Sequence, residues 1–127
     1  MTQTTKQAIT TTNAPQPAGA YSQGIAVGQF IYTAGFGPQD PATGQIPQGI
    51  TAQTRQVLRN VAALLAEHGA SLDHVVKSTV HLADLADFAD FNAAYQEFFT
   101  KPYPVRTTVG SQLPGILVEI DVVAHLP

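Results

Sequence analysis

The sequence predicts an α+β fold, with one mixed β-sheet and two helices packed on the same face of it. Three observations predict this class. β-Prone runs occupy both ends of the chain, two amphipathic helical stripes lie between them, and one further β-prone run separates the stripes. A chain of 127 residues fits one domain, residues 1–127, around one core. The sheet face without helices must then meet water or a neighbouring subunit.

β-Branched residues predict a short first strand over residues 7–12, which the prolines and glycine of residues 13–19 end. The strongly β-prone run over residues 25–34 is interrupted by Gly28, so it forms a bent pair of strands or one hairpin.

Residues 40–44 have turn chemistry at nearly every position and predict a short return strand over residues 45–47. A helix begins near Thr51, and Gly69 stands where its C-terminal cap belongs. Its apolar stripe has helical spacing and consists of Val57, Leu58, Val61, Leu64, Leu65 and His68.

Residues 75–82 predict a strand whose side chains alternate between two faces. Val76, Val80 and Leu82 are expected on the core face, opposite Lys77, Thr79 and His81. A second helix is expected from about Asp87, which can cap or complement the first turn, and Pro102 prevents its continuation. Its stripe is Phe88, Phe91, Tyr95 and Phe98.

The last quarter of the chain predicts two strands, over residues 104–109 and 117–122. If these strands pair, we expect their polar faces to coincide, so that Arg106 and Thr108 lie beside Glu119 and Asp121. The second sheet face would then carry these residues together with Lys77, Thr79, His81, Leu117 and Val123. Such a mixture suits a partly wet interface of a symmetric homo-oligomer.

Composition excludes several classes of function. Only 12% of the residues are charged, which is low for a monomer with a fully solvated surface. A net charge of -3 with six basic residues gives no electrostatic footprint for nucleic acid or an anionic membrane. The absence of cysteine excludes disulfides, thiolate catalysis and thiolate metal sites.

The four histidines show no ligand-like spacing, so we predict no metal site. Residues 1–6 lack the apolar segment of a signal peptide, and no apolar run approaches the length of a membrane span. From these observations we expect a cytoplasmic protein.

Arg106 is the principal candidate for a functional residue because a guanidinium inside a β-like run is costly unless it is paired with an anion. One interpretation is a structural bridge to Glu119 or Asp121. The other is a clamp that orients the carboxylate of an organic acid through two parallel hydrogen bonds. Glu119 is the candidate base that deprotonates water, and Asp121 competes with it because alternation places both on one face.

Four further residues have a functional and an ordinary interpretation. Tyr21 either stacks on a ligand or packs at the base of its loop, and Gly35 either allows close approach of a ligand or serves a turn. Thr108 either donates a hydrogen bond to the ligand or reflects strand propensity. Asn92 either bonds a neighbouring loop or is solvated.

With these residues in place, the chain resembles the RidA family, also called the YjgF family of reactive-intermediate deaminases. The resemblance covers nearly the whole sequence, and its specificity lies in the order and spacing of short segments. They are residues 13–15, 20–24, 33–35, 53–60, 76–80, 87–88, 92–95, 98–99, 104–107, 113–114 and 118–120.

The resemblance implies a chorismate-mutase-like fold, a homotrimer, and ligand sites at subunit junctions. It further implies hydrolysis of 2-imino acids, such as 2-iminopropanoate and 2-iminobutanoate, to 2-keto acids and ammonia without a cofactor. Arg106 matches the arginine that binds the substrate carboxylate, and Glu119 matches the acid that handles water. Tyr21 and Gly35 match the pocket wall.

The chain departs from the family pattern at the pocket. Many members carry cysteine in place of Thr108 and serine in place of Ala34, and the stretch from Leu113 to Glu119 is one residue shorter here. Imine hydrolysis needs no thiol, whereas loss of the serine hydroxyl alters how polar substrates are held. Phe36, beside Gly35, is expected to make the pocket more apolar. The choice of substrate therefore stays open.

Two other functions compete with imine deamination. A non-catalytic trimer that binds keto acids as a regulatory protein would use the same Arg106 clamp. RNA cleavage, which some relatives have been credited with, is disfavoured by the acidic balance and by the absence of a basic stripe.

Overall fold

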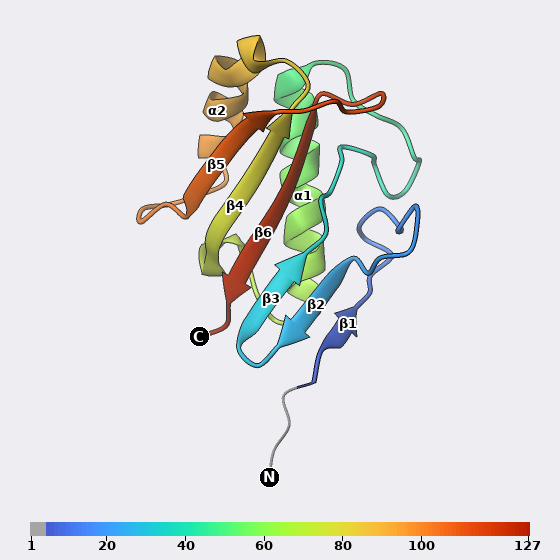
Figure 1. Cartoon of the computed structure of the whole chain (residues 1–127), viewed down its shortest axis with the longest axis vertical. Coiled ribbons are helices and arrows are strands. Elements are labelled where there is room, and N and C mark those ends of the chain that lie inside the picture. The colour runs from blue at the N-terminus through green and yellow to red at the C-terminus, as the bar shows by residue number, and fades with distance from the viewer. Residues whose placement is uncertain (1–4) are drawn as a thin grey trace.

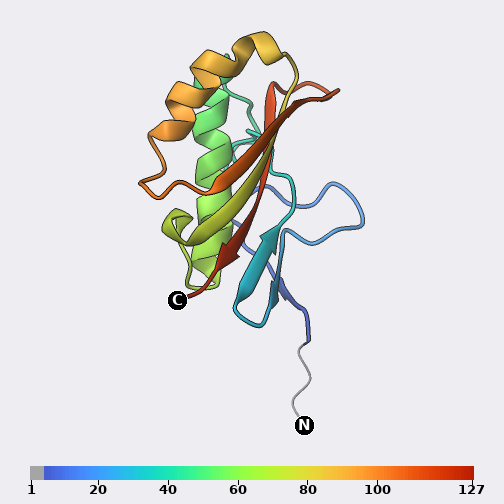
Figure 2. The same ribbon diagram turned by 60° about the vertical axis from the view of Figure 1, so that its left-hand side comes forward.

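The structure is a computed structural model that describes residues 5–127. The segment 1–6, from which we expect no signal peptide, lies partly outside this range. A six-stranded sheet has the order β1-β2-β3-β6-β4-β5, and both helices cover one of its faces (Figures 1 and 2). The strands are β1 Gln7–Ile9, β2 Gly24–Val27, β3 Phe30–Thr33, β4 Val75–Leu82, β5 Val105–Gly110 and β6 Val118–His125, and the helices are α1 Ile50–Glu67 and α2 Phe88–Gln96.

The sheet is mixed because β4 pairs with β5 in parallel while its other pairs are antiparallel. The predicted α+β class, with two helices on one face, is therefore confirmed. The N-terminal run forms a hairpin of β2 and β3, and Gly28 at its turn has φ 57°. Within residues 5–127, no helix combines the length and hydropathy needed to cross a membrane.

The return strand predicted over residues 45–47 is wrong. The amide of Asp40 donates to the Gln45 carbonyl over 2.8 Å, and that of Gly44 donates to the Asp40 carbonyl over 2.7 Å. These two bonds close the segment on itself as a loop. The Pro47 carbonyl then accepts a bond from the Gln53 side chain of α1 instead of pairing with a strand.

Helix α1 buries the predicted stripe from Val57 to Leu65, but His68 lies just beyond the helix, at its C-cap, and is only partly buried. The predicted glycine follows directly after this cap. Gly69 has φ 78° and its amide donates to Ala66, while the amide of Ala70 donates to Leu65. This pair of bonds is a Schellman motif, which satisfies the last carbonyls of the helix.

Strand β4 has the predicted bounds, but the predicted core position of Val76 is wrong. A register shift between Val75 and Lys77 turns Val76 outward, and it is 45% exposed. The core face is instead formed by Val75, Ser78, Val80 and Leu82. The buried hydroxyl of Ser78 is satisfied by the Tyr95 hydroxyl of α2 at 2.7 Å.

Asp87 occupies the N-cap position of α2, but its side chain makes no capping hydrogen bond, so the predicted side-chain cap is wrong. The alternative, that its charge complements the first turn, stays a prediction. The chain enters the helix through a 3₁₀ turn, Leu85–Asp87, so the cap lies at the start of that turn. The Asp84 carboxylate accepts a bond from the amide of Ala86 over 2.9 Å. Phe91 and Tyr95 are buried as predicted, whereas Phe88 is partly exposed.

The two C-terminal strands do not pair with each other, and this is the main correction to the predicted architecture. Strand β4 lies between β5 and β6 and pairs with both (Figure 1). The chain crosses over β4 through residues 111–117, so β5 is left as an edge strand of the sheet.

We expect Gly69→Ala to lower the free energy of unfolding by about 1 kcal/mol, because a Cβ disfavours the left-handed backbone that ends α1. Urea unfolding at fixed protein concentration measures the loss. Gly19→Ala is the matched control, since its φ lies outside that region and its added Cβ meets only the Tyr21 ring, at 3.8 Å. Equal losses in the two variants would contradict the role of backbone strain.

Candidate functional site

Arg106 lies on the helix-covered face of the sheet. In the parallel β4–β5 pair it stands opposite Ser78, whose side chain is buried beneath α2. Thr108 follows on the same face, opposite the buried Val80. The prediction that Arg106 and Thr108 share a face with Glu119 is wrong. Strand β4 lies between the two strands, and its registers set Arg106 beside the buried Ser78 but Glu119 beside His81, on the opposite face of the sheet.

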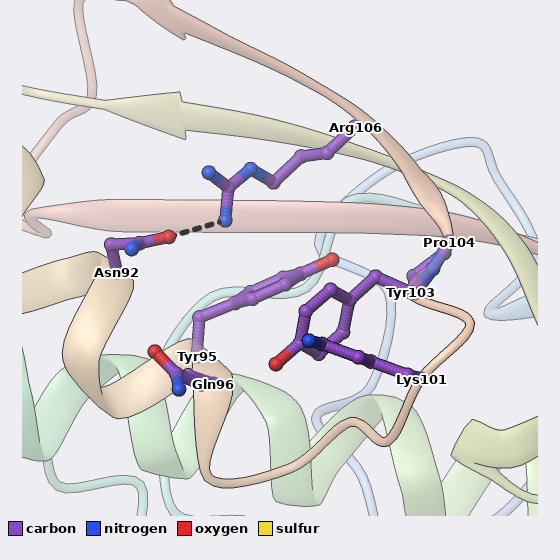
Figure 3. A pocket seen from close by; sticks show the side chains of 7 residues that line it. All are labelled: Asn92, Tyr95, Gln96, Lys101, Tyr103, Pro104 and Arg106. Atoms are coloured by element: carbon purple, nitrogen blue, oxygen red, sulfur yellow. Dashed lines mark hydrogen bonds between the residues drawn. The ribbon is translucent and has the colours of Figure 1, made fainter.

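Helix α2 holds the Arg106 side chain in place (Figure 3). One guanidinium nitrogen, Nη1, donates to the Asn92 Oδ1 over 2.9 Å. The guanidinium carbon also lies 4.7 Å from the centre of the Tyr95 ring and 5.4 Å from those of Phe88 and Phe91. A cation over aromatic faces is attracted by the ring quadrupoles, so packing and a hydrogen bond both orient the arginine.

The structural ion pair that was one interpretation of Arg106 is absent from residues 5–127. The ion pair found there joins Arg55 and Glu97. A guanidinium has five N–H donors, and Asn92 is the hydrogen-bond acceptor for Arg106 within the described residues. The remaining donors are therefore available to an anion from outside this protomer.

A cavity of ≈ 470 Å³ opens beside the guanidinium, and we call it the arginine cavity. It is lined by Asn92, Tyr95, Gln96, Lys101, Tyr103, Pro104 and Arg106. Burial raises the pKa of the Tyr95 hydroxyl, against the opposing effects of the Ser78 bond and the Arg106 charge. Tyr95 thus contributes a neutral hydroxyl and an aromatic face.

The outer face of the sheet carries the two candidate acids. Glu119 stands opposite His81 and Asp121 opposite Thr79 in the β4–β6 pair, as the predicted alternation requires. Burial raises the pKa of Asp121, and the charges of His81 and Lys77 partly oppose this effect.

Glu119 lies against the backbone of Gly35. A Cβ at residue 35 would stand 2.8 Å from the Glu119 Oε1, so this position requires glycine while the carboxylate keeps its place. The preceding residue, Ala34, lines a cavity of ≈ 440 Å³ together with Tyr21. Tyr21 is 51% exposed, and its hydroxyl accepts a bond from the amide of Ala18.

The predicted site residues thus do not form one cluster within a single protomer. Arg106, Asn92 and Thr108 belong to the helix-covered face, and Glu119 belongs to the outer face with Gly35 beside it. Phe36 belongs to neither group, because it is 4% exposed and packs in the core. The expectation that its ring makes the pocket more apolar is therefore wrong.

Sequence reasoning missed most of the lining of the arginine cavity. The sequence predicts only a packing role for Tyr95, in the stripe of α2, and no role for Gln96, Lys101 or Tyr103. Their signal was proximity in the chain, since the short connection from α2 leads directly into β5, whose second residue is Arg106. Among residues 5–127, no group of three or more histidines and acids is arranged to hold a metal ion.

Residues 11–126 match the model of the family described as Endoribonuclease L-PSP. The chain belongs to this family. A RutC family protein of Pyrococcus abyssi is 49% identical over 94% of this chain and 97% of its own. The 2-iminobutanoate/2-iminopropanoate deaminase of Escherichia coli is 41% identical over 91% of this chain and 94% of its own. The resemblance to the RidA family is confirmed.

Solved structures of the family have the same fold. RidA from an Antarctic Psychrobacter is 38% identical, with a TM-score of 0.91 over 94% of this chain and 99% of its own. Escherichia coli TdcF, solved with bound serine, is 37% identical, with a TM-score of 0.90 over 95% of this chain and 99% of its own.

We expect Asp121→Asn to raise the free energy of unfolding near pH 7.5 by less than about 1 kcal/mol, given solvent screening of a half-exposed group. Burial raises the pKa of this carboxyl. The protonated carboxyl therefore contributes to stability at low pH, and this contribution is lost as the pH rises through the folded-state pKa. The amide of the variant cannot ionise, so the difference in unfolding free energy between variant and wild type should shrink as the pH falls toward 4.

Urea unfolding at matched protein concentrations measures this dependence. Glu67→Gln, at an exposed carboxylate near the end of α1, is the control with the same change of charge. A gain from Asp121→Asn that grows at low pH would contradict the argument.

Proposed function

We propose that this protein hydrolyses 2-imino acids to 2-keto acids and ammonia. The observation that carries the proposal is the position of Arg106 and the lack of a charge partner for it. It is oriented by Asn92 and three aromatic rings, lacks an acidic partner within residues 5–127, and faces a cavity. A guanidinium held in this way binds a carboxylate through two parallel charge-assisted hydrogen bonds and fixes its plane.

We further propose that each site forms between protomers of a homotrimer. Arg106 and Glu119 lie on opposite faces of one sheet, so a small ligand between them would need a second copy to supply one of the two. Exposed apolar side chains support such contacts, and they include Phe30, Tyr32, Val105 and Val109. Strand β5 is also an edge strand, and Val105 on it is 67% exposed.

In the proposed reaction, Arg106 of one protomer holds the substrate carboxylate beside Glu119 of the next. Glu119 removes a proton from water as the water oxygen forms a bond to the electrophilic imine carbon. For a protonated imine, Glu119 returns this proton to the nitrogen of the resulting carbinolamine. The C–N bond then breaks as the hydroxyl oxygen becomes the keto group, and the departing ammonia takes the hydroxyl proton and leaves as ammonium. Orientation and general-base assistance suffice for this sequence, which involves no change of oxidation state.

The relatives support this substrate class. Relatives about 40% identical bear the name of 2-iminobutanoate/2-iminopropanoate deaminase. The serine bound to TdcF shares with a 2-imino acid a carboxylate and a nitrogen on the neighbouring carbon.

Glu119 is favoured over Asp121 as the water-handling acid. Its carboxylate adjoins Gly35, and the residue before Gly35, Ala34, lines the cavity of ≈ 440 Å³ together with Tyr21.

We expect Arg106→Ala to abolish turnover of 2-iminobutanoate while the protein stays folded, because Arg106 makes no ion pair with the described residues whose loss would leave a buried charge. Ammonia release from enzymatically generated imine measures turnover, and circular dichroism with sizing chromatography reports the fold and assembly. Full turnover by the folded variant would refute the carboxylate clamp. A wild type that binds 2-oxobutanoate without releasing ammonia would instead favour a non-catalytic keto-acid binding protein.

We expect Glu119→Gln to lower kcat by roughly 10²- to 10⁴-fold, the usual contribution of general acid–base catalysis. Loss of turnover in Asp121→Asn instead would assign the water-handling role to Asp121.

Co-expression of Arg106→Ala with Glu119→Gln tests whether the site is shared between protomers. Random mixing should restore about a quarter of the wild-type activity, because that share of the junctions joins two intact halves. No recovery would refute a site made by two protomers.

A further inference from the structure

The arginine cavity contains a second cation at its far end, Lys101, to which neither the proposed reaction nor the names of the relatives give a role. We propose that Lys101 binds a second carboxylate, on the side chain of the substrate, so that the preferred substrates are acidic 2-imino acids. This inference rests on the proposed function and specifies its substrate class.

The charges of the cavity carry the first part of the argument. Its lining includes two cations, Arg106 and Lys101, and no aspartate or glutamate among the described residues. Lys101 forms no ion pair within residues 5–127, in contrast to Arg55, which Glu97 neutralises at 2.8 Å. Two such cations in one concavity create a local positive potential on a chain whose net charge is -3.

The arrangement of the side chains carries the second part (Figure 3). Lys101 comes from the connection between α2 and β5, and its side chain runs back beside Tyr103 toward the end of α2. Arg106 enters the same cavity from the β5 side, beyond the Tyr95 ring. A ligand whose first carboxylate is held by Arg106 would reach Lys101 by extending its side chain past the Tyr95 ring.

The neutral polar groups at this end suit a carboxylate. The Gln96 amide and the Tyr103 hydroxyl both line the cavity and can donate hydrogen bonds. Its volume of ≈ 470 Å³ exceeds what 2-iminopropanoate fills, so the smallest imino acids would leave Lys101 without a partner. A dicarboxylic imino acid uses both cations.

Equilibrium binding of stable keto-acid analogues to the full chain tests the inference without requiring catalysis. We expect wild-type protein to bind 2-oxoglutarate about tenfold more tightly than 2-oxobutanoate in calorimetry, the size of one charge-assisted hydrogen bond. Lys101→Met should remove this preference, and Lys101→Arg should retain most of it. Arg59→Met is the matched control, since it removes an exposed charge on α1 that lines none of these cavities.

Equal binding of the two keto acids by wild type, or a preference that survives Lys101→Met, would overturn the inference. Turnover separates it from the proposed function. Hydrolysis of the imines of alanine and glutamate at equal kcat/KM would leave the deaminase standing and remove the acidic preference. A preference for 2-oxoglutarate that depends on Lys101, without hydrolysis of either imine, would support the binding site and refute the deaminase.

Discussion

The parallel pairing of β5 with β4 is the constraint on which the candidate site depends. It places Arg106 opposite Ser78 and therefore beneath α2, where Asn92 and the aromatic stripe of the helix orient the guanidinium. An antiparallel pairing of β5 with β6 would have placed Arg106 beside the acids of β6, where a salt bridge would have consumed its donors. The edge position of β5 leaves the same arginine accessible.

Helix α2 links the stability of the fold to the chemistry of the site. Tyr95 packs in the core, satisfies the buried hydroxyl of Ser78, and presents its ring to the Arg106 guanidinium. One residue therefore closes the core and forms the floor of the arginine cavity. Core packing and the Ser78 bond leave this side chain little further freedom to lose when a ligand binds, which lowers the entropic cost of binding.

The outer face has the opposite character. Its acids stand among exposed apolar side chains, and Gly35 allows the Glu119 carboxylate to approach the backbone. Neither face of a single protomer carries a full set of groups for imine hydrolysis. Association of copies is therefore part of the proposed chemistry, because it brings the carboxylate clamp of one chain to the acid of another.

Local sequence patterns were enough to predict the α+β class, the bounds of β4, most of the stripe and the glycine cap of α1, and the residue types from which the site is built. These features follow from local periodicity and from the conformational freedom of Gly69, which act within a few residues. Tertiary structure alone decided which strands adjoin, that Val76 turns outward at a register shift, and that Arg106 and Glu119 lie on opposite faces. Alternation fixes the relative faces of residues within one strand, whereas the relation between two strands depends on long-range pairing, which local sequence does not encode.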